Sequence, residues 1–315
     1  MARLTAEDTA AISKWLKAEE EVIHQMEKEM KGTYAYYRLL SWYYPIWNTS
    51  DKKEQEKIKG YILKAHEMEP ENPDIYPNLF NLYEVYQPDD EKMKEVAIKW
   101  KASGDHSPTL MALSYNMLLN TKKNAILITA GDNDTYPLWI AQYVDSFRTD
   151  VQVCNISLLL LPEYRNRIFK KLGIPALKGD HHRFGAISQH IIKHKGDHPV
   201  YFSNKSIVPK DSALYEHLYN VGVIYKYSED NFNNQSLVVD NFENVLLTDH
   251  LKYDFYQSQF PKMDRQLNLF YIPGLITLYK HYLLIEEEQK ALSTKLLVQK
   301  LAKDTNYEEY VTKVL

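Results

Sequence analysis

Glycine and cysteine are scarce in this sequence, and a net positive charge is absent. Only 10 of the 315 residues are glycine, which argues against a β-barrel or β-sandwich because those folds use glycine in many tight turns. The single cysteine, Cys154, cannot form an internal disulfide, and its place in a mostly apolar run predicts a buried thiol. The net charge of −4 offers no basic surface to a polyanion, so we expect no nucleic-acid partner.

Long hydrophobic runs are missing as well. A membrane-spanning helix needs about 18 successive apolar residues, and the most apolar stretch, Ile156 to Pro162, is far shorter. The first residues also lack the apolar core of a signal peptide. We therefore expect no direct membrane insertion. The expected location is cytoplasmic by default, and periplasmic or in the cell envelope if the chain is a mature or trimmed form.

The familiar catalytic motifs do not occur. The sequence has no Gly-x-Ser-x-Gly elbow of a serine hydrolase and none of the glycine-rich loops that cradle nucleotide phosphates. Cys154 lies inside a predicted strand and is poorly placed to act as a nucleophile. The sequence therefore predicts no catalytic residue and no cofactor, although it leaves open whether any reaction is catalysed.

Tyrosine, in contrast, is abundant, and the first part of the chain has the 3.6-residue apolar period of helices. Residues around one joint between helices fall at the offsets of a tetratricopeptide repeat: Ala65, Pro70, Tyr76, Leu79 and Tyr83. We expect a tetratricopeptide-like helical-repeat domain over residues 1–121. An unrelated helical bundle is the alternative, because Phe80 stands where the repeat usually has a small residue.

An aromatic stripe lies within this helical part. It could form a platform for a peptide or sugar, but side chains at helical spacing more often belong to a core. Its members are Tyr34, Tyr36, Tyr37, Trp42, Tyr43, Tyr44 and Trp47.

The apolar pattern changes after residue 122. The run from Ala125 to Thr129 predicts a short buried strand, and a polar loop and a helix from Pro137 to Phe147 follow it. Val151 to Asn155 predicts a second strand. A strand, a helix and a strand in this order form a right-handed βαβ unit with parallel strands.

Later segments extend this unit. We expect a third strand over Pro199–Ser203, a helix over Ala213–Val221 and an edge strand over Val223–Tyr227. The predicted fold class is α/β plus α, with tetratricopeptide-like helices flanking a small parallel-sheet, Rossmann-like domain at residues 122–230. Residues 231–315 are expected to form a C-terminal helical region packed on that domain.

Polar residues follow each of the three predicted parallel strands. In open α/β sheets, ligands bind at the carboxyl ends of the strands, where the strand order reverses. The candidate ligand-binding residues are Asp132, Asn133, Asp134, Thr135, Asn155, Ser157, Ser203 and Asn204. Two carboxylates so close could also hold a divalent cation. The structural alternative is that Asp134 or Thr135 caps the following helix while Asp132 and Asn133 shape the turn.

Histidines cluster between residues 181 and 198. His190 and His194 are four residues apart on a predicted helix, a spacing that zinc sites use. No glutamate lies between them in the His-Glu-x-x-His manner, and charged neighbours favour solvated imidazoles, so they are weak metal candidates only. The other members are His181, His182 and His198. We also expect Arg148 and Asp150 to pair with each other or to cap local backbone.

One string carries a family resemblance. Residues 124–139 contain Gly-Asp-Asn-Asp-Thr followed by an aromatic residue and Pro-Leu-Trp, and Arg-Thr-Asp-Val follows at residues 148–151. This string resembles the soluble C-terminal region of a bacterial multi-spanning membrane-protein family of unknown function. That family is related to glycosyltransferases and protein O-mannosyltransferases. The resemblance implies a place in a cell-envelope assembly. It argues against a stand-alone transferase, because the catalytic acid of such enzymes lies in the membrane part.

Two functional hypotheses follow. In the first, the protein is a non-catalytic scaffold whose helical repeats hold a protein partner, while the α/β domain docks onto or senses a ligand. In the second, it is an enzyme or accessory subunit of glycan or glycoprotein metabolism with a sugar- or metal-binding pocket at the Asp132–Thr135 loop. An exposed apolar groove on the repeats would favour the first hypothesis. A deep pocket at that loop would favour the second.

Overall fold

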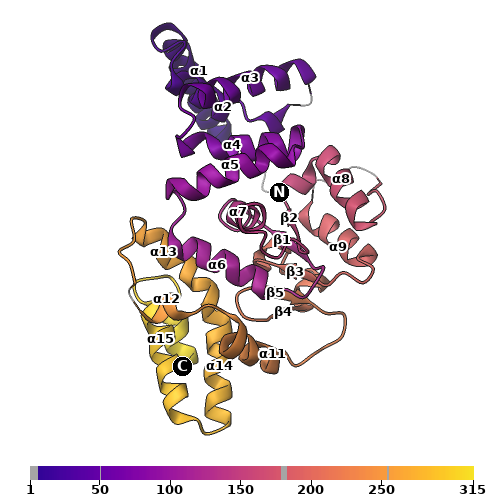
Figure 1. Ribbon diagram of the computed structural model, residues 1–315, viewed down its shortest axis with the longest axis vertical. Helices are drawn as coiled ribbons and strands as arrows, with labels where there is room; N and C mark the ends of the chain where they lie inside the picture. The colour runs from indigo at the N-terminus through magenta and orange to yellow at the C-terminus, as the bar shows by residue number, and fades with distance from the viewer. Residues whose placement is uncertain (1–5, 50, 179–182, 254) are drawn as a thin grey trace. The chain divides into compact units, whose positions relative to one another are not determined.

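The computed structural model describes residues 6–49, 51–178, 183–253 and 255–315. The chain divides into two compact units, Met1–Asp89 and Asp90–Leu315 (Figure 1). None of the helices in the described ranges is long and apolar enough to cross a membrane.

The N-terminal unit is entirely helical in its described part. Thr33 starts α2 by accepting a hydrogen bond from the amide of Tyr36, and Asp51 caps α3 in the same way through Lys53. The elements are α1 (Ala6–Glu29), α2 (Tyr34–Tyr43), η1 (Ile46–Asn48), α3 (Lys52–Met68), η2 (Pro73–Ile75), α4 (Tyr76–Asn81) and the π-turn η3 (Leu82–Tyr86).

The joint between α3 and α4 has the predicted position. Ala65, Tyr76 and Leu79 are fully buried there, and Phe80, the residue that departs from the repeat, is also fully buried. The structure thus shows a helical unit with a packed joint. Whether these helices are tetratricopeptide repeats stays a prediction.

The second unit contains a five-stranded sheet in the order β2-β1-β3-β5-β4. Its parallel part pairs Thr129 of β1 with Asn155 of β2, and Ile128 of β1 with Phe202 of β3. β5 runs antiparallel to both of its neighbours, so the other four strands share one direction. The strands are β1 (Ile126–Thr129), β2 (Gln152–Asn155), β3 (Val200–Phe202), β4 (Leu218–Asn220) and β5 (Tyr225–Tyr227).

The helix predicted over Ala213–Val221 is wrong in its second half. α10 ends at Glu216, and the next residues form β4, which pairs with β5. A short, partly apolar run has no periodicity that separates a helical turn from a strand, so the tertiary partner decides.

Helices cover both faces of this sheet. Figure 1 shows α6 and α7 on one side and α8 and α9 on the other, as right-handed crossovers from β1 to β2 and from β2 back to β3 require. The helices and helical turns are α5 (Asp90–Ser103), α6 (Pro108–Leu119), α7 (Tyr136–Asp145), η4 (Leu158–Leu160), α8 (Pro162–Leu172), α9 (Phe184–His194), η5 (Lys205–Ile207), α10 (Ala213–Glu216), α11 (Gln235–Asp240), η6 (Asn241–Val245), α12 (Asp249–Lys252), α13 (Pro261–Asn268), η7 (Leu269–Tyr271), α14 (Ile272–Leu284), α15 (Glu288–Ala302) and α16 (Glu308–Val314).

The unit with the sheet begins with α5, at Asp90, whereas we placed the boundary between residues 121 and 122. α5 and α6 both pack against α7. Aromatic rings fill the α5–α7 contact. The ring centroids of Trp100 and Tyr136 lie 5.5 Å apart, and those of Tyr136 and Trp139 lie 5.8 Å apart. Part of the Pro-Leu-Trp motif therefore has a packing role.

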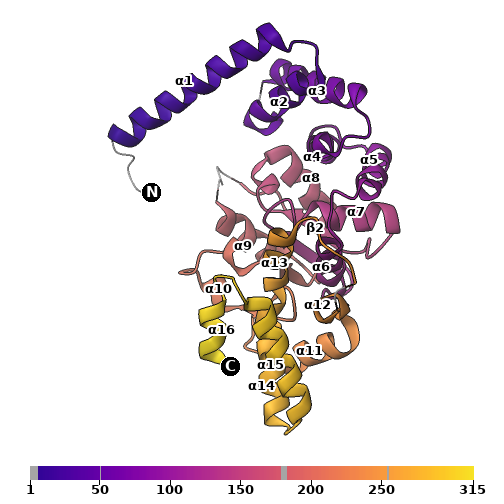
Figure 2. The same ribbon diagram turned by 90° about the vertical axis from the view of Figure 1, so that its left-hand side faces the viewer.

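The C-terminal helices form an antiparallel pair, α14 and α15, which lie side by side in Figure 2. Gly274 in α14 permits a close approach to the rest of the unit. A β-carbon there would lie 2.5 Å from the Phe242 ring and 2.6 Å from the carbonyl oxygen of Gly222.

Candidate functional site

The carboxyl ends of β2, β1 and β3 meet at one edge of the sheet. β1 lies between β2 and β3. The chain passes from β1 to β2 on one side and then returns across β1 to β3 on the other side, so the strand order reverses beside β1. The amide of Ser203 donates to Ile128 (2.9 Å), and that of Ile156 donates to Thr129 (2.9 Å). This edge therefore gathers the three predicted polar clusters.

Asp134 is the central carboxylate of this edge and is only 9% exposed. It accepts hydrogen bonds from the amides of Ala130 (2.9 Å) and Gly131 (2.6 Å). The hydroxyl of Ser203, on the neighbouring strand, also donates to it. A buried charge needs such donors, and here they come from the loop after β1 and from the end of β3.

Thr135 and Asn155 form a second buried pair. The hydroxyl of Thr135 donates to the carbonyl of Gly131 (2.5 Å) and contacts the hydroxyl of Thr129 (2.7 Å). It also accepts from the side-chain amide of Asn155 (3.0 Å). One hydroxyl has one donor and two acceptor positions, so Thr135 uses its full capacity inside the protein.

Asn155 also shapes the turn after β2. Its side-chain oxygen accepts from the amides of Ser157 (2.8 Å) and Leu158 (3.2 Å). Sequence reasoning placed Asn155 at the site, and the structure brings it to Thr135 as expected.

The expected cap of the following helix is confirmed in its position but not in its side-chain hydrogen bond. Thr135 occupies the cap position of α7, but its side chain makes no capping hydrogen bond, and the Asp134 carboxylate binds the preceding loop. The amides of Thr135 and Tyr136 donate instead to the backbone carbonyl of Asp132. Both side chains are engaged by the neighbouring strands, and sequence spacing alone does not reveal those contacts.

The remaining candidates face outward. Asp132, Asn133 and Ser157 are exposed, and Asn204 is half-buried and caps η5 through the amide of Ser206 (2.9 Å). Asp132 is reachable by solvent, yet surrounding protein atoms partly desolvate its carboxylate. That desolvation raises the pKa of Asp132, a side-chain hydrogen bond with Tyr136 opposes the rise, and the charge of Asp134 adds to it. Any ligand at this edge would meet Asp132 and Asn133 first.

Arg148 and Asp150 form a structural clamp, as expected. Two guanidinium nitrogens of Arg148 reach the two carboxylate oxygens of Asp150, at 2.9 and 3.0 Å. The guanidinium also donates to the carbonyls of Leu118 (2.8 Å) and Thr121 (3.0 Å). The hydrogen bonds from Arg148, then the one from the amide of Asn124, and then the Arg148 charge lower the pKa of Asp150 to about 2. The clamp ties the α7–β2 turn to the end of α6.

The histidines form no metal cluster in the described part of the chain, which holds no group of three or more suitable ligands. The rings of His190 and His194 lie 4.6 Å apart. A nitrogen of His190 bonds to the carbonyl of Pro175 (2.7 Å), and the His190 ring stacks on Phe169. His181 and His182 lie outside the described residues.

Sequence reasoning missed two hollows. One is an apolar groove between α1 and α2 that includes Trp42, a residue whose spacing favoured a core position but whose side chain is 70% exposed. The other lies among the C-terminal helices, where no single segment carries a recognisable motif. Only the shared helical faces of α14 and α15 could have indicated it.

Comparison with known proteins gives one partial match. The model of the family described as TMEM260-associated domain 2 matches residues 110–174, which include β1, α7, β2 and α8. No curated protein and no solved structure matches the chain significantly. Over this βαβ segment the chain is similar to that domain, in loose agreement with the resemblance to proteins related to O-mannosyltransferases.

Proposed function

We propose that this protein is a non-catalytic binding protein. Its N-terminal helices, which we take to be tetratricopeptide-like, hold a protein partner, and its α/β domain docks onto or senses a ligand within a larger, cell-envelope assembly. The observation that carries this proposal is the exposed apolar groove of the N-terminal unit.

The groove lies between α1 and α2 and has a volume of about 280 Å³. Trp42, Val22 and Leu39 are 70%, 57% and 44% exposed, whereas Met26 and Leu40 form a buried floor. Three large apolar side chains in water around one concave surface are typical of a contact site for another protein.

An amphipathic helix of a partner fits this surface best. Such a helix can place apolar side chains at successive turns into a groove between two helices. Trp42 would supply the large aromatic contact that interface hot spots often contain. Its exposure also means that its replacement should disturb the unit itself very little.

Site-specific photo-crosslinking in the native host tests the proposal. We would introduce a benzoylphenylalanine at Val22 in the groove and, as a matched control, at Trp47, which is 43% exposed and does not line the groove. We expect one partner to crosslink from position 22 alone. The purified partner should then bind the Trp42→Ala variant at least about tenfold more weakly than the original chain. Equal binding by the two proteins would contradict the proposal.

The second candidate function is an enzyme or accessory subunit of glycan or glycoprotein metabolism. It is favoured by the exposed Asp132 carboxylate at the strand-order reversal and by the TMEM260-associated match. Calorimetric titration of monosaccharides and of Mn²⁺ into the original chain and an Asp132→Asn variant tests it. Binding that the substitution abolishes would support this function, and the absence of binding by the original chain would count against it.

A further inference from the structure

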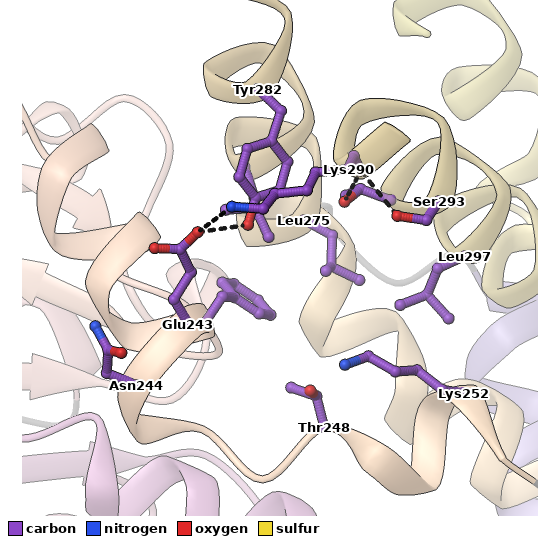
Figure 3. A pocket seen from close by; sticks show the side chains of 12 residues that line it. Glu243, Asn244, Thr248, Lys252, Leu275, Tyr282, Lys290, Ser293 and Leu297 are labelled. Carbon is purple, nitrogen blue, oxygen red and sulfur yellow. Dashed lines mark hydrogen bonds and ion pairs between the residues drawn. The ribbon is translucent and has the colours of Figure 1, made fainter. Parts of the chain in front are cut away.

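A second hollow lies entirely within the C-terminal helices and is distinct from the sheet edge. It has a volume of about 710 Å³, inside the range of small-molecule sites in proteins. η6, α12, α14 and α15 each contribute part of its wall (Figure 3). No residue of the Asp132–Thr135 loop takes part in it.

The apolar part of the wall comes from facing helices. Leu275 and Leu278 of α14 and Leu297 of α15 line the hollow, together with Phe242 of η6. On α15 the lining residues are spaced at three- and four-residue steps, so that one side of the helix faces the hollow. Gly274 keeps Phe242 close to α14, because a β-carbon there would collide with its ring.

The charged groups of the wall are arranged asymmetrically. Glu243 accepts a hydrogen bond from the hydroxyl of Tyr282 (2.8 Å) and lies 3.8 Å from the ammonium of Lys290. Lys290 is thus neutralised by Glu243 at one side of the hollow. Burial, followed by the hydrogen bond with Glu243, raises the pKa of Tyr282, so that its hydroxyl stays a donor.

Lys252 is the other cation of the wall. Figure 3 shows its ammonium directed into the hollow from α12, across from the Glu243–Lys290 pair. Among the described residues it has no hydrogen-bond or ion-pair partner. Thr248, 9% exposed at the start of the same short helix, adds a hydroxyl beside it. The wall therefore combines an apolar surface with one uncompensated positive charge.

We propose that this hollow binds an anionic amphipathic small molecule, with a carboxylate or phosphate group on Lys252 and an aliphatic or aromatic body against Leu275, Leu278 and Leu297. The anion neutralises the lysine charge that the described wall of this hollow leaves unpaired. The body removes the leucine side chains and its own apolar surface from water. Because Lys252 is exposed, the ionic part of the affinity falls as salt concentration rises.

Calorimetric titration of four probes into the full chain tests the proposal: decanoate, decyl phosphate, decanol and inorganic phosphate, all below their micelle concentrations. We expect decanoate or decyl phosphate, or both, to bind saturably at one site, and each of the other two to bind at least tenfold more weakly. The preference between the two amphiphiles identifies the head group. Decanol binding equal to that of decanoate, or inorganic phosphate binding equal to that of decyl phosphate, would overturn the proposal.

Two variants locate the site. Lys252→Met keeps the length of the side chain but removes its charge, and should weaken binding of the anionic amphiphile at least tenfold. Lys262→Met, an exposed position on α13 outside the hollow, is the matched control and should bind as the original chain does. Leu297→Trp should obstruct the apolar part of the hollow and weaken binding at least tenfold while circular dichroism stays unchanged. Unaltered binding by both hollow variants would refute the assignment, whatever the outcome of the groove experiment.

Discussion

Asp132 and Asp134 differ sharply in their surroundings although one residue separates them. Asp134 holds two backbone amides and the Ser203 hydroxyl, whereas Asp132 is exposed. The strand ends that bring polar groups together follow from the apolar pattern, so the sequence predicts this edge. It cannot predict which carboxylate is buried, because the donors are backbone amides of a loop whose shape is set by the fold.

Replacement of each carboxylate by alanine should separate their roles. Asp134→Ala leaves two partly buried amides and the buried Ser203 hydroxyl without their acceptor, and should lower the free energy of unfolding by about 2–4 kcal/mol. Asp132→Ala should change it by less than about 0.5 kcal/mol. Urea unfolding followed by circular dichroism measures both. Similar losses in the two variants would show that the loop does not depend on Asp134.

The Arg148–Asp150 clamp also acts at the scale of single residues. The planar guanidinium of Arg148 donates hydrogen bonds to a carboxylate and to two backbone carbonyls at the same time. We expect Arg148→Ala to lower the free energy of unfolding by about 2–4 kcal/mol. Arg148→Lys should recover only part of this loss, because one ammonium cannot reach all of these acceptors. Denaturant titration of the original chain, Arg148→Ala and Arg148→Lys measures the free energy of unfolding of each protein. Full recovery by lysine would mean that charge alone stabilises the turn.

At the scale of elements, segments with a clear apolar pattern were predictable, including the short strands β1, β2 and β3, whereas β4 was not. α7, expected over Pro137–Phe147, spans Tyr136–Asp145. β4, with three residues, was taken for the end of a helix, because its hydrogen-bond partners come from β5. The strand is specified by pairing that no local window of sequence contains.

Two glycines on helices give opposite predictions. Gly274→Ala places a methyl group 2.5 Å from the Phe242 ring and 2.6 Å from a backbone oxygen, and should destabilise the protein by about 1–3 kcal/mol. Gly60→Ala in α3 meets no atom within 4 Å and should stabilise its helix by about 0.5–1 kcal/mol. Thermal unfolding of the two variants measures the sign of each effect. Stabilisation by Gly274→Ala would contradict the close approach of α14.

At the scale of the whole chain, the order of parts was predictable: helices, then a mostly parallel sheet, then helices. The position of the division was not. α5 and α6 have the same helical period as the preceding helices, but they pack on α7. Periodicity identifies a helix and its apolar face, while the partner that covers this face is a property of the folded molecule.

The unit that contains the sheet should lose stability in acid, and His106 should account for a defined part of that loss. The ring centroids of His106 and Trp100 lie 4.7 Å apart, and Nδ1 of His106 is buried without a hydrogen-bond partner. Burial lowers the pKa of His106 to about 4, so its neutral form is favoured in the folded state and its charged form in the unfolded state. The stability that depends on neutral His106 is complete above pH 6.5, the ordinary pKa of histidine, and is lost as the pH falls towards 4. Asp150 contributes a separate loss between its ordinary pKa of 3.8 and about 2.

The variant His106→Phe isolates the first window, because phenylalanine keeps the ring contact with Trp100 and does not titrate. Between pH 7 and pH 4.5 the original chain should lose roughly 1–3 kcal/mol more stability than the variant. Urea unfolding at the two pH values measures the difference. Below pH 3.8 the two curves should run in parallel, since the Asp150 clamp is common to both. An identical pH dependence above pH 4.5 would mean that His106 is solvated in the folded protein, and that the α5–α7 contact around Trp100 opens more readily than its packing implies.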